Sequence, residues 1–290
     1  MFKIFRKNNL RKDTRTEKRN DMFKLKWSNP LGFPHKPSAI CYDSKCHLLA
    51  IGTSFGLIRV YGKPGVCYYG QFSYDIEIVK LEFILGKGIL ICLTNDNMLT
   101  LWKLTSNRSI KMIIFSKINK EEFIITCFSV MNASFVICGT DLGNVCFLGL
   151  PQLNRIVKKD IFFSKIHSIV NIKSQMNYRR IQKITVCPCD SEKWIIAFSR
   201  SLIVIYNIEN DILLYSFTHE EELQDICWNP SGKSFIMSTV HGSYIQWNLH
   251  ESSAGIPKTP YGPDPCKPMN NIFVSSLETY GYLIIIRAVL

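Results

Sequence analysis

The sequence predicts an all-β protein, an incomplete WD40-like β-propeller with about five blades and the start of a sixth. First, one pattern of strand, turn, apolar strand, turn and third strand recurs five times along the chain. Second, the third strand of each copy closes on a bulky residue: Tyr61, Trp102, Leu148, Tyr206 and Trp247. These residues lie 41, 46, 58 and 41 positions apart, against ~40–45 for a four-stranded propeller blade.

The blades are expected near 36–62, 76–104, 122–150, 180–208 and 220–249, with an incomplete one at 266–290. A small sheet that is apolar on both faces cannot bury both alone, so neighbouring blades must stack. We therefore expect Trp102 and Trp247 to pack between blades. Gly56, Gly143 and Gly242 precede third strands, where a tight turn favours glycine because positive φ costs it little.

The longest interval contains an interruption of the repeat. Between Pro151 and Tyr178 the chain has room for the outer strand of the third blade and for an insertion. A second join, from His250 to Pro268, holds the proline-rich stretch "KTPYGPDPCKP" (258–268). Each proline fixes φ and delays the next strand, so this stretch is expected to be a stiff surface crossing between blades five and six.

Composition favours a globular protein in a reducing compartment. Of the 290 residues, 47% are hydrophobic and 12% aromatic, which argues against disorder. The eleven cysteines stand mostly alone inside apolar runs, as small buried hydrophobes do. The closest pair, Cys187-Pro188-Cys189, lacks the spacing of a zinc or redox motif. Without a signal peptide or a membrane-length apolar run, the expected compartment is the cytoplasm.

Residues 1–30 form a basic arm ahead of the predicted propeller, which occupies 31–290. Positions 1–26 hold ten Lys and Arg against three Asp and Glu, a balance of +7 out of the chain's +12. The expected contact is an anionic membrane surface, through Lys3, Arg6, Lys7, Arg11 and Lys12. A solubilising tail is the alternative. Nucleic-acid binding is not expected, because the arm lacks the interleaved aromatic residues of a single-strand binder.

The sequence offers no constellation for catalysis. It holds no G-x-S-x-G, no P-loop and no G-x-G-x-x-G, which are the frameworks for nucleophilic and nucleotide chemistry. The six histidines are scattered without metal-ligand spacing. We expect no enzymatic activity, no cofactor and no metal.

Two stretches resemble a known family. "LGFPHKPSAICYDSKCHLLAIGTSFGLIRVYGKPGV" (31–66) looks like the first blade of the lethal giant larvae/tomosyn family. "TPYGPDPCKPMNNI" (259–272) is similar to a motif of the lethal giant larvae branch. The structural and family-signature residues are Gly52, Gly56, Arg59, Trp102, Gly143, Trp247, Pro260, Tyr261, Gly262, Pro263, Cys266 and Lys267.

The resemblance implies a non-enzymatic scaffold for cell polarity and exocytosis, cytoplasmic and peripheral at the plasma membrane and cell cortex. Its implied partners are syntaxin-type SNAREs, non-muscle myosin II and a polarity complex. The resemblance implies two seven-bladed propellers, so we expect this chain to correspond to an N-terminal fragment with an open edge. The phosphorylatable regulatory loop of the family is absent. The alternative function is a generic WD40 adaptor in another trafficking or RNA-processing complex.

Overall fold

The computed structural model describes residues 33–107, 109–117, 122–131, 133–170, 180–250, 255–260, 268–269, 271–274 and 283–286. Residues Pro34–Leu290 form one compact unit, to which the following paragraphs apply. The basic arm lies outside the described residues, as does most of the proline-rich stretch, including Tyr261, Gly262, Pro263, Cys266 and Lys267.

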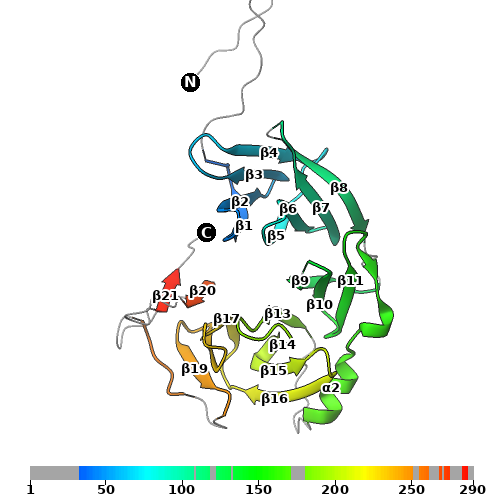
Figure 1. Cartoon of the computed structure of the whole chain (residues 1–290). Coiled ribbons are helices and arrows are strands. Elements are labelled where there is room, and N and C mark those ends of the chain that lie inside the picture. Colours follow the sequence, from blue (N-terminus) through cyan, green and yellow to red (C-terminus); the bar gives the residue numbers. More distant parts are fainter. Residues whose placement is uncertain are drawn as a thin grey trace, which may run out of the picture. The chain divides into compact units, whose positions relative to one another are not determined.

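Five antiparallel sheets and the beginning of a sixth follow one another along the chain (Figure 1). The first two sheets are β1 (Pro37–Asp43), β2 (Leu48–Thr53), β3 (Leu57–Tyr61), β4 (Cys67–Gln71), and β5 (Ile78–Ile84), β6 (Ile89–Thr94), β7 (Met98–Leu104), β8 (Ile110–Lys117). The third and fourth are β9 (Ile125–Met131), β10 (Phe135–Thr140), β11 (Val145–Gly149), β12 (Asn154–Arg155), and β13 (Ile181–Val186), β14 (Lys193–Phe198), β15 (Leu202–Asn207), β16 (Ile212–Thr218). The last two are β17 (Leu223–Trp228), β18 (Ser234–Thr239), β19 (Tyr244–Asn248), and β20 (Asn271–Val274), β21 (Leu283–Ile286).

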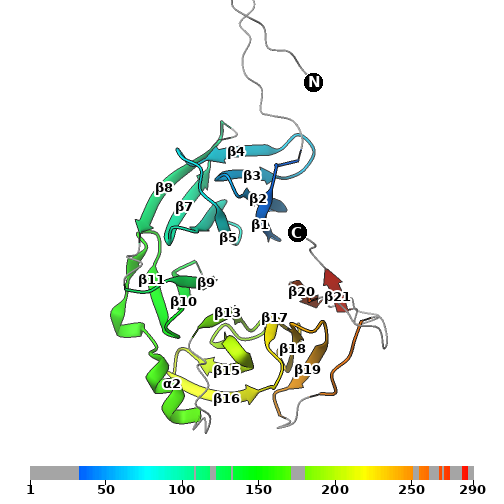
Figure 2. The same cartoon turned by 180° about the vertical axis from the view of Figure 1, so that it is seen from behind.

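The strands of each sheet lie side by side in chain order, and the first strand of each sheet is the innermost (Figures 1 and 2). Each first strand contacts the first strand of the next sheet, from β1 through β5, β9, β13 and β17 to β20. Among the described residues no sheet joins β20–β21 to β1, so these sheets do not close a ring. This confirms the predicted fold class, an incomplete β-propeller.

The hydrophobic core is divided into four clusters, each shared by two successive sheets. Trp102 packs edge-on against Phe72 of the preceding sheet at 5.0 Å, and its Nε1 donates to Thr100 Oγ1 at 2.8 Å. Trp247 likewise belongs to the cluster between the fourth and fifth sheets. The bulky third-strand residue therefore packs toward the preceding sheet. Tyr61, in the first sheet, has no preceding sheet among the described residues and is only half-buried.

The turns before the third strands have the geometry that the glycines predict. The φ angles of Gly56, Gly143 and Gly242 are +76°, +84° and +81°. Asn97 takes the same place in the second sheet with φ of +69°. In the fourth sheet the turn Ser199–Ser201 has positive φ at two non-glycine residues, a conformation that the sequence did not indicate.

The insertion after β11 contains a helix that the strand pattern did not predict. A short 3-10 turn (Val157–Lys159) is followed by the helix α2 (Phe163–Val170). Phe163 packs against Phe198 at 5.5 Å, and Ile166 is fully buried in the cluster between the third and fourth sheets. The helix thus supplies apolar cover that the two-residue outer strand β12 is too short to give.

Close packing between sheets requires glycine at two equivalent positions. A Cβ on Gly139 would lie 2.6 Å from Ile181 Cγ2, and one on Gly52 would lie 2.7 Å from Ile78 Cγ2. In each case the isoleucine is the first residue of the next innermost strand. Real Cβ contacts are not this short, so these glycines set how closely the sheets approach.

We expect Gly139→Ala to lower the free energy of unfolding by about 1–3 kcal/mol, the usual cost of overpacking a tight core. Urea denaturation followed by tryptophan fluorescence measures the change. Gly149→Ala is the matched control, because the nearest atom to its added Cβ would be Ile156 Cδ1 at 3.4 Å. Equal effects of the two substitutions would contradict the packing argument.

Candidate interaction surface at the innermost strands

Every innermost strand from β1 to β17 carries a register shift near its start. The shifts fall between Pro37 and Ala39, Ile78 and Lys80, Ile125 and Cys127, Ile181 and Lys183, and Leu223 and Asp225. A β-bulge of this kind turns a side chain out of the regular alternation. The five sheets therefore present a side chain at the same place, beside the next sheet.

A polar side chain at or directly after each bulge bonds to the next sheet. Ser38 Oγ donates to the carbonyl oxygen of Ile78 at 2.7 Å. In the third sheet, the hydroxyl of Thr126 donates to the carbonyl oxygen of Ile181. Both hydroxyl contacts occur where a glycine, Gly52 or Gly139, lets the sheets approach closely.

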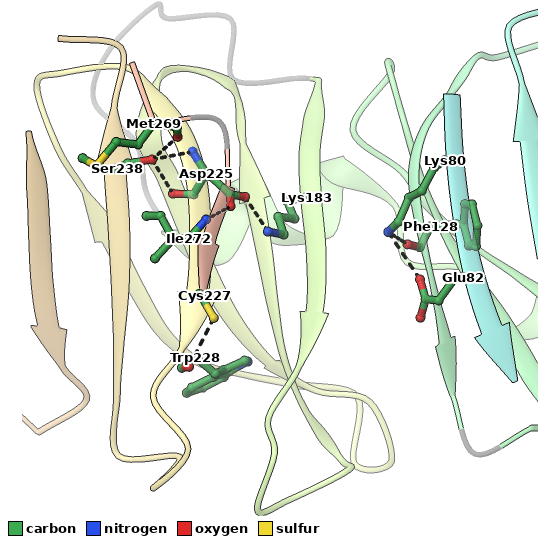
Figure 3. Close-up of polar contacts among 10 residues, drawn as sticks. All are labelled: Lys80, Glu82, Phe128, Lys183, Asp225, Cys227, Trp228, Ser238, Met269 and Ile272. Atoms are coloured by element: carbon green, nitrogen blue, oxygen red, sulfur yellow. Dashed lines mark hydrogen bonds and ion pairs between the residues drawn. The ribbon is translucent and has the colours of Figure 1, made fainter. Parts of the chain in front are cut away.

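The second sheet uses a charged pair instead (Figure 3). The ammonium group of Lys80 donates to the carbonyl oxygen of Phe128 and lies 3.4 Å from Glu82 Oε2. Glu82 Oε1 accepts from the backbone N–H of Val130 at 2.8 Å and from Ser129 Oγ at 3.2 Å. Two charged side chains of β5 thus bind three successive residues of β9.

Asp225 connects three sheets, as Figure 3 also shows. It is paired with Lys183 of the fourth sheet, and its Oδ2 accepts from the backbone N–H of Ile272 in β20 at 2.8 Å. Ser238 Oγ accepts from the Asp225 N–H at 3.1 Å and donates to the carbonyl oxygen of Met269 at 2.9 Å. Because Asp225 is buried, these charge-assisted bonds offset the cost of removing its carboxylate from water.

At one end of the innermost strands the first four sheets enclose a cavity of about 850 Å³. Its rim carries Lys45, Lys87 and Glu82, beside the exposed apolar side chains of Tyr42 and Leu85. Pockets of several hundred Å³ with a few convergent polar groups are typical binding sites. The mixture of cationic and apolar groups suits a peptide segment that carries both acidic and apolar side chains.

Asp43 holds this rim together. Its Oδ1 accepts from the N–H groups of Lys45 at 2.9 Å and Cys46 at 3.1 Å, while Oδ2 accepts from Gly86 N–H at 2.9 Å. One buried carboxylate therefore fixes the β1–β2 turn to the β5–β6 turn of the next sheet. Burial acts to raise the pKa of Asp43, but the three backbone donors outweigh it and leave the pKa below its ordinary value.

Cys41, one of the thiols that line the cavity, is not an activated nucleophile. Burial, with a contribution from the nearby Glu82 carboxylate, raises the pKa of Cys41 far above its ordinary value. Cys41 therefore stays a protonated thiol at neutral pH. Within the described ranges, no three His, Cys, Asp or Glu side chains are grouped to hold a metal ion. In the same ranges no helix is long and apolar enough to cross a membrane.

The signature residues that the structure describes are framework residues and do not line the cavity. Gly52, Gly56 and Gly143 occupy close contacts or turns. Arg59 is buried in β3, with Nη1 3.4 Å from the Tyr61 hydroxyl. The tryptophans at 102 and 247 are in the core, and Pro260 lies in the turn after the Tyr244–Lys258 bridge.

Sequence reasoning missed the residues that join the sheets: Ser38, Lys80, Glu82, Thr126, Lys183 and Asp225. A usable signal was present, because a polar residue follows the start of each apolar inner strand at the blade interval. Aligning the five copies on the first residue of these strands, rather than on the bulky residue, would have found it.

Sheet order, innermost-strand contacts and shared cores define a β-propeller. Among solved structures, the computationally designed Ika8 protein matches 82% of this chain with a TM-score of 0.57 and 10% sequence identity, a likeness of fold alone. No protein-family model matches the chain.

Curated relatives show which proteins the chain is similar to. The lethal(2) giant larvae protein of Drosophila pseudoobscura pseudoobscura is 30% identical over 276 residues, which are 91% of this chain and 23% of that protein. Human LLGL scribble cell polarity complex component 2 is 27% identical over 278 residues, covering 88% of this chain and 26% of its own length. Similarity to lethal giant larvae proteins at 25–30% identity over 88–94% of this chain supports its assignment to that family. The chain spans about a quarter of the length of these relatives.

Replacing Asp43 with asparagine tests the rim. We expect Asp43→Asn to lower the free energy of unfolding by about 1–3 kcal/mol at pH 7, because an amide cannot accept all three backbone bonds. The pKa of this carboxylate is lower in the folded than in the unfolded protein, where it is about 3.9. Its contribution to the free energy of unfolding is therefore fully present above about pH 3.9 and is lost as pH falls through the folded pKa.

Urea denaturation from pH 7 to pH 3 measures the free energy of unfolding of wild type and variant. The difference between the two free energies should become smaller below about pH 4. Asp75→Asn, at an exposed position, is the control and should change little. A difference that stays constant with pH would contradict the role given to the Asp43 carboxylate.

Proposed function

We propose that this chain is a non-enzymatic scaffold that takes part in cell polarity and exocytosis by binding other proteins. The observation that carries the proposal is its similarity, over most of its length, to lethal giant larvae proteins. One human relative is named as a component of the scribble cell polarity complex. Syntaxin-type SNAREs, non-muscle myosin II and a polarity complex are the proposed partners, at the cytoplasmic side of the cell cortex.

The propeller offers a physical basis for such binding. Its innermost strands are fixed to one another by the bonds of Ser38, Lys80, Thr126, Lys183 and Asp225. The turns that rim the cavity are therefore held by a rigid frame, which lowers the entropy lost when a partner docks. Lys45 and Lys87 at the rim favour an acidic segment, and Tyr42 and Leu85 add apolar contact area.

A generic WD40 adaptor in another trafficking or RNA-processing complex is the alternative. It would share the fold and the cavity but not the SNARE partner. Binding to the cytosolic domain of a syntaxin-type SNARE therefore separates the two proposals.

A pull-down with the full chain provides that test. We expect the SNARE domain to be retained, and the double variant Lys45→Glu and Lys87→Glu to reduce retention about tenfold, since it reverses two rim charges. Lys233→Glu is the control, because it reverses a charge at an exposed turn outside the cavity. This variant should retain the SNARE domain as well as wild type does.

Retention of the SNARE by neither wild type nor control would leave the adaptor as the better proposal. Equal retention by all forms would place the binding surface away from the cavity. Circular dichroism of each variant establishes that the fold is preserved.

We also propose that the basic arm contacts anionic membrane, through Lys3, Arg6, Lys7, Arg11 and Lys12. Each basic residue near such a surface contributes about 1 kcal/mol, and salt screens the attraction. Vesicles that contain phosphatidylserine should sediment with the full chain. Deleting residues 1–26 should abolish sedimentation, and neutral vesicles serve as the control. Unchanged binding after the deletion would refute the proposal.

A further inference from the structure

The outermost strand of the second sheet, β8, presents a long free edge. It spans eight residues and pairs with β7. Among the described residues β4 approaches the start of β8, where Tyr69 bridges to Ser109, and no strand of any sheet pairs with the other edge of Ile110–Lys117. Figure 1 shows it along the outside of the sheet. Among the other outer strands, β12 has two residues, β4 has five, β16 has seven and contacts the helix α2, and β19 is paired with the chain at Lys258.

Apolar side chains of β8 face solvent. The exposed fractions are 44% for Met112, 49% for Ile113 and 63% for Phe115, whereas Ile110 at the start of the strand is buried. Exposed apolar residues that cluster on one edge strand mark a site for strand addition by another chain.

Charge beside this edge favours one kind of occupant. Lys103 of β7 stands directly opposite Lys111 of β8, and both are exposed. Like charges in a cross-strand pair repel each other. A carboxylate from an added strand would relieve the repulsion, whereas β8 of a second copy carries two lysines and no carboxylate.

The register shift in β8 also opposes self-association. The pairing with β7 skips Ile113, between the pairs Leu101–Ile114 and Trp102–Met112. Such a bulge breaks a flat edge and hinders indiscriminate pairing. A short strand of matched sequence can still add along Ile114–Lys117 or Ile110–Met112.

We propose that β8 is a docking strand for an extended acidic segment of a partner protein, which adds to the second sheet by β-augmentation. Backbone hydrogen bonds to the free edge supply affinity, and the side chains supply selectivity. Met112 and Phe115 contact apolar side chains of the segment, and the lysine pair binds its carboxylate. This interaction is separate from the cavity and from the SNARE proposal.

The probe is a fluorescein-labelled heptapeptide of sequence Glu-Val-Thr-Val-Glu-Val-Thr, with a version that has lysine in place of both glutamates. Fluorescence anisotropy with the full 290-residue chain measures binding. We expect the acidic peptide to bind more tightly. Lys111→Glu should shift the ratio of the two affinities toward the lysine peptide by about tenfold, since each cross-strand charge pair contributes up to about 1 kcal/mol.

A second variant tests the apolar contacts. Phe115→Ser should weaken binding of the acidic peptide. Leu142→Ser, at an exposed turn of the third sheet, should leave that binding unchanged. Hydrogen exchange should show new protection of the backbone amides in 110–117. Three results would overturn the proposal: equal affinity of both peptides, protection confined to another strand, or dimerisation of the chain that Phe115→Ser abolishes.

Discussion

The contact between neighbouring innermost strands is the constraint on which the rest of this propeller depends. A single blade buries only part of its apolar surface, and each core here is shared by two sheets. The sheets must therefore meet at a fixed angle and distance. A bulge at the start of each inner strand and a polar side chain beside it fix that geometry. Apolar packing supplies the stability, and these directional bonds select one arrangement.

The polar bonds between neighbouring innermost strands, here called junctions, are of two chemical kinds. Where Gly52 or Gly139 allows close approach, a short hydroxyl from Ser38 or Thr126 reaches the next strand. Where the equivalent residue is larger, as Leu93 in the second sheet or Ala197 in the fourth, a longer lysine side chain reaches across. In these four sheets the bonding side chain is thus short where the paired residue is glycine and long where it is larger. A charged junction also carries a greater desolvation cost, which the Glu82 and Asp225 carboxylates offset.

Local patterns predicted the strands and turns well. Alternating apolar residues and glycine positions specify a strand and its turn within one blade, and blade spacing then implies stacking. The pattern could not predict the helix Phe163–Val170, because it is stabilised by a core that the third and fourth sheets build together. The hydrogen bond from Gly86 to Asp43 could not be predicted for the same reason, because Gly86 lies in another blade. Contacts between repeats leave little trace in any one repeat.

Position in the blade separates the two proposed binding surfaces. The cavity rim is tied to the innermost strands through Asp43, so its shape depends on the junction between the first two sheets. The β8 edge lies at the opposite side of its sheet, where β8 pairs with β7 and its first residue, Ile110, packs into the core of the first two sheets. Loss of a junction bond should therefore distort the rim while leaving the backbone edge of β8 in place. The two proposed sites would be occupied with little coupling, because none of the residues that line the cavity belongs to β8.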